Sequence, residues 1–152
     1  MLTKKTKYAL LALTALAKTY GQGLTQISEI STQQRIPHKF LELILLDLKN
    51  LGFLVSKKGR GGGYALARPP AGITMGEIVR SLEGPVAALP CAGPAPKACN
   101  ECDDVESCGL RMVMTKVSAS MDSVLDRTSL AAVLEWEEQA LDRRAHDSSY
   151  QI

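Results

Sequence analysis

The chain has 152 residues, of which 45% are hydrophobic and 22% charged, as in an ordinary folded soluble protein, and its length excludes two large domains. Its net charge of +2 conceals an asymmetry. Residues 1–60 hold ten Lys and Arg against three Asp and Glu, whereas the other 92 residues hold eight against thirteen. A basic half joined to an acidic half is typical of a protein that binds a polyanion at one end.

The first element is a predicted helix over about residues 3–20, with apolar residues at helical spacing and glycines after it. Its early lysines and apolar stretch resemble a signal peptide. However, Lys18 interrupts the stretch and no cleavage site follows. No apolar run approaches the roughly 20 residues of a membrane span. We therefore expect a cytoplasmic protein without a membrane partner.

Two further helices are predicted before residue 52. The first begins after Thr25, a candidate N-cap, and the polar stretch 32–35 is expected to turn the chain. The second runs from Pro37, at its first position, to about Leu51, and Gly52 follows as a C-terminal cap. Its predicted buried stripe comprises Phe40, Leu41, Ile44, Leu45 and Leu48.

A β-hairpin is predicted next, with strands over residues 53–57 and 64–67 and a glycine-rich, basic tip over residues 58–63. A capping box of Thr74 and Glu77 then begins a helix that ends near residue 82. This order of elements is that of a winged helix. The predicted fold class is mainly α with a small β-hairpin wing, and residues 1–83 form a winged helix-turn-helix DNA-binding domain.

The second half of the chain is predicted to be a loop followed by helices. Residues 84–108 form a cysteine-containing loop, residues 107–143 a long dimerisation helix and a C-terminal helix, and residues 144–152 a loose tail. Apolar residues recur every three or four positions along the long helix and predict a seam for a partner helix. The alternative is that this seam packs on its own domain. The seam comprises Leu110, Val113, Val117, Met121 and Val124.

A winged helix places its third helix in the major groove of duplex DNA and its wing on the backbone or minor groove. Lysines and arginines suit phosphate, and a glutamate can accept a hydrogen bond from a cytosine amine. The candidate DNA-binding residues are Lys4, Lys5, His38, Lys39, Glu42, Lys57, Lys58 and Arg60.

Three rival functions have less support from the residues. The glycine-rich tip lacks the Lys-Ser/Thr and the helix of a phosphate-binding loop. No Ser/His/Asp or paired-carboxylate arrangement indicates an enzyme. A winged helix that binds protein instead of DNA has little use for a basic, glycine-rich wing, and its binding would lack the steep salt dependence of DNA binding.

All four cysteines, Cys91, Cys99, Cys102 and Cys108, fall within 18 residues. Structural disulfides are disfavoured in a reducing compartment, so this clustering indicates a metal or redox role. Zinc prefers two close pairs, whereas only Cys99 and Cys102 are close in sequence. Four thiolates on a loop can wrap an iron–sulfur cluster. The spacing favours a cluster and leaves zinc and a thiol or disulfide switch as alternatives.

Together these motifs resemble the Rrf2 family of bacterial regulators, which includes iron–sulfur regulators of cluster assembly and of the iron and nitric oxide responses. The resemblance covers roughly residues 1–135. It is carried by MLTKKTKYALLAL, IPHKFLELIL, KGRGGGYALA, ITMGEIVRSLEG, CGLRMVM and TSLAAV.

The resemblance implies a homodimer formed by the long helix, a near-palindromic double-stranded DNA operator, and a 2Fe-2S or 4Fe-4S cluster that controls DNA affinity. Members of the cluster-assembly type use three cysteines and a non-cysteine ligand, and Cys91, Cys99 and Cys108 lie at the general positions of those three. Cys102 is then a fourth ligand or a bystander. Glu42 resembles the family's base-discriminating acid, whereas Arg60 lies where some relatives have proline. Some relatives lack a cluster, so zinc or no cofactor stays an alternative.

Overall fold

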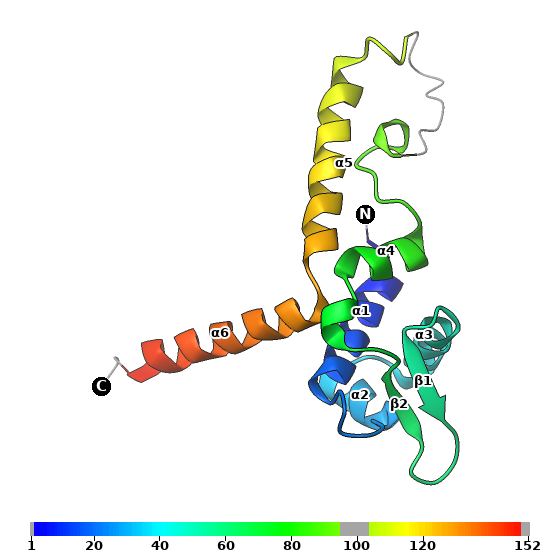
Figure 1. Cartoon of the computed structure of the whole chain (residues 1–152), viewed down its shortest axis with the longest axis vertical. Coiled ribbons are helices and arrows are strands. Elements are labelled where there is room, and N and C mark those ends of the chain that lie inside the picture. Colours follow the sequence, from blue (N-terminus) through cyan, green and yellow to red (C-terminus); the bar gives the residue numbers. More distant parts are fainter. Residues whose placement is uncertain (1, 95–103, 150–152) are drawn as a thin grey trace.

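The computed structural model describes residues 2–94 and 104–149. Within these residues there are six α-helices and one two-stranded hairpin. Four of the helices and the hairpin form a body, and the other two helices, the last in the chain, extend from it in different directions (Figure 1). The mainly α fold with a small hairpin is confirmed. In the described part of the chain, no helix has the length and hydropathy to cross a membrane.

Helix α1 (Lys4–Lys18) forms the centre of the body. Its N-cap, Thr3, accepts a hydrogen bond from the backbone N–H of Thr6, which satisfies one of the free amides of the first turn. Leu13 and Leu16 are almost fully buried in a core to which every other helix except α5 contributes. Leu130, at the start of the last helix, is fully buried in the same core, so both ends of the chain are joined to one folded unit.

Helix α2 (Ile27–Gln34) differs from its sequence prediction at both ends. Gln26, not Thr25, is the N-cap, and its side chain makes no capping hydrogen bond. Thr25 instead forms a backbone bridge with Tyr64. The polar stretch 32–35 was predicted as a turn, but the helix continues to Gln34, and the turn begins at Arg35 with a φ of 53°. The Thr32 hydroxyl donates to the carbonyl of Ser28, so its polar side chain is satisfied within the helix.

Helix α3 (His38–Asn50) buries four residues of the predicted stripe, with Leu41, Ile44, Leu45 and Leu48 at 0% exposure, whereas Phe40 is only partly buried. Pro37, predicted as the first helical residue, is instead the N-cap, and the helix begins one position later at His38. Gly52, with a φ of 83°, follows the helix as predicted and lets the chain reverse. Phe53 is then buried beneath the hairpin.

Strands β1 (Leu54–Lys57) and β2 (Gly63–Leu66) are antiparallel, with Leu54 opposite Leu66 and Lys57 opposite Gly63. We call this hairpin and its tip, residues 54–66, the wing. A 3-10 turn (Pro70–Gly72) leads to α4 (Met75–Glu83). The Thr74 hydroxyl accepts from the N–H of Glu77, which confirms half of the predicted capping box. The Glu77 carboxylate pairs instead with Arg68.

Helix α5 (Gly109–Arg127) extends well beyond the body (Figure 1). Arg80 of α4 holds its lower part through ion pairs with Asp122, at 3.3 Å, and with Asp126. Higher along the helix, the buried Ser118 hydroxyl accepts from the N–H of Ala88 at 3.0 Å, so the loop after α4 runs beside α5. A short 3-10 turn (Pro90–Ala92) ends the part of this loop that packs there.

Helix α6 (Leu130–Ser149) extends from the body in a different direction from α5 (Figure 1). The sequence predicts its end near Arg143, but the helix continues to Ser149, because no Gly or Pro interrupts it. Lys18 of α1 forms an ion pair with Glu137 at 2.6 Å, which attaches the first half of α6 to the body. Trp136 and Leu141 of α6 are 56% and 64% exposed, so the described part of the chain does not bury them.

The Glu83 carboxylate joins the end of α4 to the start of α1. It accepts hydrogen bonds from the N–H of Thr3 at 2.8 Å, from the Thr3 hydroxyl at 2.5 Å and from the Thr6 hydroxyl. These hydrogen bonds lower the pKa of Glu83 from 4.5 to about 2, and the bond from the Thr3 hydroxyl has the largest effect. Because the pKa is lowered on folding, the ionised Glu83 carboxylate stabilises the folded state fully above pH 4.5, and this stabilisation is lost as the pH falls toward 2.

We predict that Glu83→Gln lowers the free energy of unfolding by about 1 kcal/mol at pH 7, because water weakens hydrogen bonds to an exposed carboxylate. The difference from wild type should shrink as the pH falls below 4.5. Urea unfolding at several pH values measures it. A difference that stays constant down to pH 2 would contradict this assignment.

Candidate nucleic-acid interface and cysteine site

The solvent face of α3 carries three of the predicted DNA-binding residues. His38, Lys39 and Glu42 are all exposed, and His38 Nδ1 lies 3.5 Å from Glu42 Oε1 across one helical turn. This face is opposite to the buried stripe, so burial of the stripe presents these polar groups outward.

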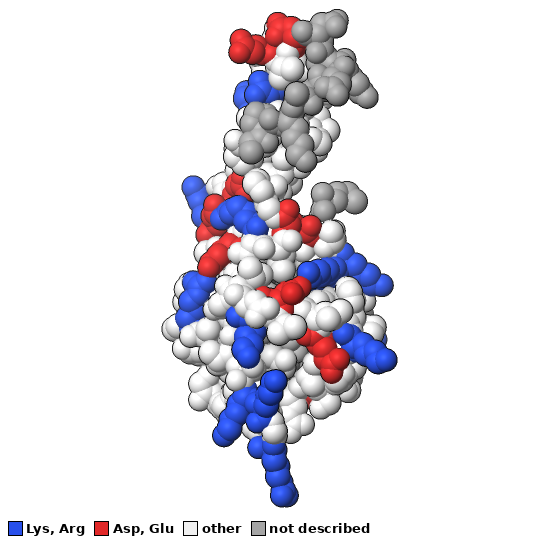
Figure 2. Space-filling model, turned by 90° about the vertical axis from the view of Figure 1, so that its right-hand side faces the viewer, with Lys and Arg blue, Asp and Glu red and all other residues white. Residues whose placement is uncertain are grey.

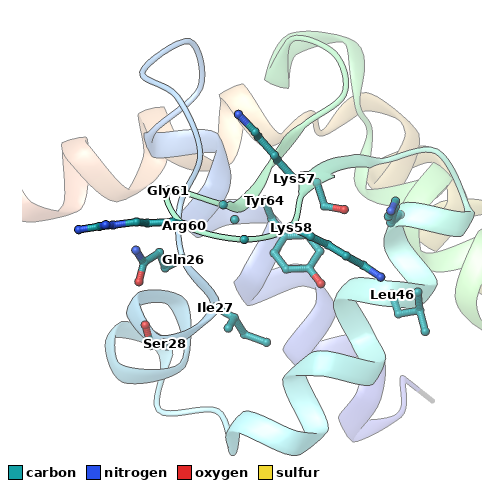
Figure 3. Close-up of a pocket in the computed structure, with 14 residues that line it drawn as sticks. Gln26, Ile27, Ser28, Leu46, Lys57, Lys58, Arg60, Gly61 and Tyr64 are labelled. Carbon is teal, nitrogen blue, oxygen red and sulfur yellow. The ribbon is translucent and has the colours of Figure 1, made fainter.

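A hollow of about 490 Å³ lies between the wing, the start of α2 and the solvent face of α3. We call it the wing hollow. Lys49 of α3 and the three predicted cations of the wing, Lys57, Lys58 and Arg60, line it. In Figure 3 the Lys58 side chain runs toward α3, whereas Arg60 extends in the opposite direction, over the start of α2. These cations therefore spread along the hollow instead of clustering at one point.

The backbone fixes where the wing lies. Thr25 and Tyr64 exchange two hydrogen bonds, of 2.9 Å and 2.8 Å, which join the loop before α2 to β2. A Cβ on Gly63 would overlap the carbonyl oxygen of Thr25, so only glycine permits this approach. The hairpin was predictable from the sequence but this bridge was not, because a single pair of backbone contacts leaves no side-chain pattern.

The predicted contacts Lys4 and Lys5 lie in the first turn of α1. Lys5 Nζ pairs with Asp47 of α3 at 2.6 Å, and Lys4 Nζ lies 5.6 Å from the centre of the Tyr8 ring. Lys5 is thus brought to α3, and neither lysine lines the wing hollow. Figure 2 shows that lysines and arginines extend from the lowest part of the body, whereas acidic side chains lie higher, across the middle of the molecule and near the tip of α5. The charge asymmetry of the sequence is therefore also spatial.

Two of the four cysteines lie in the described part of the chain. Cys91 and Cys108 are free thiols and half-buried. Cys108 is the N-cap of α5, and Arg111, one turn later, donates from Nε to the carbonyl oxygen of Cys91 at 2.9 Å and from Nη1 to that of Val105 at 3.4 Å. Arg111, which sequence reasoning missed, therefore holds the backbone of Cys91 beside the turn that Cys108 begins.

The predicted ligands Cys99 and Cys102 lie outside the described residues. Within residues 2–94 and 104–149, no group of three or more His, Cys, Asp or Glu side chains could hold a metal ion. Near Cys108, hydrogen bonds from the Ser107 hydroxyl and then from backbone N–H groups lower the pKa of Asp104. A negative charge thus lies beside the cysteine site.

Most of the predicted seam of α5 is exposed in the described part of the chain. Leu110, Val113, Val117 and Val124 are 60%, 56%, 40% and 64% exposed, and Met121 is partly buried. Arg111, Ser118 and Asp122, which bond to the loop and to α4, lie on a different face of the helix. The described part of the chain therefore leaves Leu110, Val113, Val117 and Val124 exposed and packs only Met121 partly on its own body.

Comparison with known proteins agrees with this arrangement. Residues 2–135 match the model of the Rrf2 family, described as iron-dependent transcriptional regulators. An Rrf2-like HTH-type transcriptional regulator of Rhodobacter capsulatus is 41% identical over 88% of this chain and 92% of its own length. Among solved structures, CymR, the global cysteine regulator of B. subtilis, superposes with a TM-score of 0.75 at 27% identity over 90% of this chain and 97% of that chain. IscR of T. potens superposes with a TM-score of 0.72 at 29% identity, over 92% and 90%.

We predict that Gly63→Ala displaces the wing, because its methyl group breaks the bridge to Thr25. The loss of two backbone hydrogen bonds should lower the free energy of unfolding by about 1–3 kcal/mol, and binding to a random-sequence DNA duplex should weaken several-fold. Gly72→Ala is the matched control, since nothing lies within 4 Å of its Cβ position. Fluorescence anisotropy with a labelled duplex measures the DNA affinity of both variants. Equal affinity of Gly63→Ala and wild type would refute the role of the bridge.

Proposed function

Because this chain belongs to the Rrf2 family of transcriptional regulators, we propose that it acts as a homodimer that binds a near-palindromic DNA operator under the control of an iron–sulfur cluster. The cluster would be held by the cysteine segment, residues 91–108. The proposal depends above all on one observation: Arg111 holds Cys91 beside the first turn of α5, which Cys108 begins.

The α3 face and the wing supply the DNA contacts. Lys39 and Glu42 can reach base edges, because they lie on the solvent face of α3, opposite to its buried stripe. Lys57, Lys58 and Arg60 neutralise phosphates from the wing, and Lys49 adds a cation on the opposite wall of the wing hollow. His38 contributes a hydrogen bond from the first turn of α3, and Lys4 and Lys5 add phosphate contacts at the edge of the body.

The apolar face of α5 supplies the dimer contacts. Its exposed leucine and valines would be covered by the same residues of a second chain, as expected for a two-fold interface. Each valine or leucine that is fully buried this way contributes about 1.5–3 kcal/mol. Two chains joined along α5 carry two α3 helices, which suits a near-palindromic operator.

The thiols fit an iron–sulfur cluster by their chemistry. Cys91 and Cys108 are unpaired and half-buried at the two ends of the segment that also contains Cys99 and Cys102. When bound, a cluster supplies a redox-active iron centre that reacts with oxidants and nitric oxide. The chain's own part is to hold four thiolates, or three with Cys102 as a bystander, at the tip of α5. The carboxylate of Asp104 adds negative charge there.

Control of DNA binding follows the length of α5. Arg111 and Ser118 hold the loop of residues 88–91 along the helix, and Arg80 holds the base of the helix on the body. Ordering of the cysteine segment would therefore fix how α5, and with it the partner chain, is oriented relative to α3. This is a two-state element that a ligand biases.

A thiol switch or a zinc site is the second candidate. It is favoured by the two free, half-exposed thiols and by the likeness to a structure described as a cysteine regulator. The same cysteines would then respond through disulfide formation or zinc binding.

The cofactor is tested on full-length protein purified without oxygen, by visible absorption and by assays of iron, acid-labile sulfide and zinc. We expect a coloured protein with iron and sulfide, and loss of both in Cys91→Ser and in Cys108→Ser. Ser120→Ala, on the exposed part of the same helix, is the control and should keep both. Zinc without sulfide, or no metal after reconstitution, would overturn the cluster and favour the second candidate.

DNA binding is tested on the same preparation by enriching bound sequences from a random duplex library and measuring affinity at several salt concentrations. We expect an enriched near-palindrome, with affinity that falls steeply as salt rises. Lys57→Gln and Lys58→Gln should each reduce the slope of log affinity against log salt by about 1. Failure to enrich any sequence, together with salt-independent binding, would contradict a DNA-binding role.

A further inference from the structure

The solvent face of α3 also carries two leucines. Leu43 and Leu46 are 62% and 49% exposed, whereas the core uses the other four leucine and isoleucine side chains of the same helix at 0% exposure. Positions 43 and 46 follow positions 39 and 42 at helical spacing, so the leucines share a face with Lys39 and Glu42. The fold therefore does not use these side chains for its own core.

The surroundings of Leu46 are cationic. Leu46 lines the wing hollow together with Lys49 and Lys58, and Figure 3 shows the Lys58 side chain directed from the wing toward α3, where Leu46 lies. An apolar pair bordered by cations is complementary to an anionic partner that also offers an apolar group. Duplex DNA fits this description, since the C5-methyl groups of thymines project into the major groove between two rows of phosphates.

We propose that Leu43 and Leu46 recognise thymine C5-methyl groups in the major groove and so determine part of the operator sequence. This inference rests on the proposed binding of α3 to duplex DNA. The two residues are separated by roughly 4.5 Å along the helix axis, close to the 3.4 Å rise of one base pair, so they meet methyl groups on neighbouring base pairs. Lys39 and Glu42 read polar base edges beside them.

The test uses the duplex that wild-type protein enriches from a random library. Each thymine of one half-site is replaced in turn by deoxyuridine, which removes only the methyl group. At one or two thymines we expect the affinity of wild-type protein to fall about four-fold, the effect of about 0.8 kcal/mol for one buried methyl-sized group. In Leu43→Ala or Leu46→Ala this loss should disappear at the thymine which that leucine contacts.

Leu51→Ala is the matched control. Leu51 is 45% exposed, close to the value for Leu46, but it follows the end of α3 and lines a different hollow, with Lys5 and Leu82. This variant should keep the full penalty for deoxyuridine. Circular dichroism should give the same helix content for all three variants, because none of these side chains belongs to the core.

Two results would overturn the inference while leaving the proposed function intact. One is an enriched operator at which deoxyuridine changes the wild-type affinity at no position. The other is a methyl dependence that persists in both Leu43→Ala and Leu46→Ala, which would assign the methyl contact to another residue. If the wild-type protein enriches no sequence at all, both the proposed function and this inference fail.

Discussion

The attachment of α5 to the body is the constraint on which the rest of the molecule depends. Arg80 of α4 reaches both Asp122 and Asp126. The hydrogen bond to Asp126 is the main cause that raises the pKa of the Arg80 guanidinium. A Cβ on Gly76 would overlap Asp126, so α4 and α5 pack closely there. This contact is the base of a helix whose other end carries the cysteine segment, and it links the cysteines to the body that presents α3.

The sequence predicted the order of the elements because each has a local signal. Thr3 and Thr74 cap helices, Gly52 ends one, and the stripe from Leu41 to Leu48 repeats at helical spacing. Element boundaries were missed for different physical reasons. Thr25 pairs with the hairpin instead of capping α2, and α6 continues past the predicted end because no helix-breaking residue follows.

The candidate site could be predicted in part, for a similar reason. The clustered cysteines and the basic wing residues are evident in the sequence, whereas the spacing of the α5 seam predicted an apolar face without deciding what covers it. The role of Arg111 was not visible, because its partner is a backbone carbonyl twenty residues away. Leu43 was missed for another reason: it lies outside the predicted buried stripe, but an apolar side chain has no charge or polar group that marks it as a DNA contact.

The most direct measurement is the ratio of operator affinities of iron-loaded and iron-depleted protein, in wild type and in Arg80→Gln. The account predicts a ratio that differs from 1 by at least about five-fold in wild type, a typical size of allosteric coupling, and a ratio near 1 in Arg80→Gln. Lys18→Gln, which removes an ion pair of similar exposure between α1 and α6, should keep the wild-type ratio. An unchanged ratio in Arg80→Gln would contradict transmission through the base of α5.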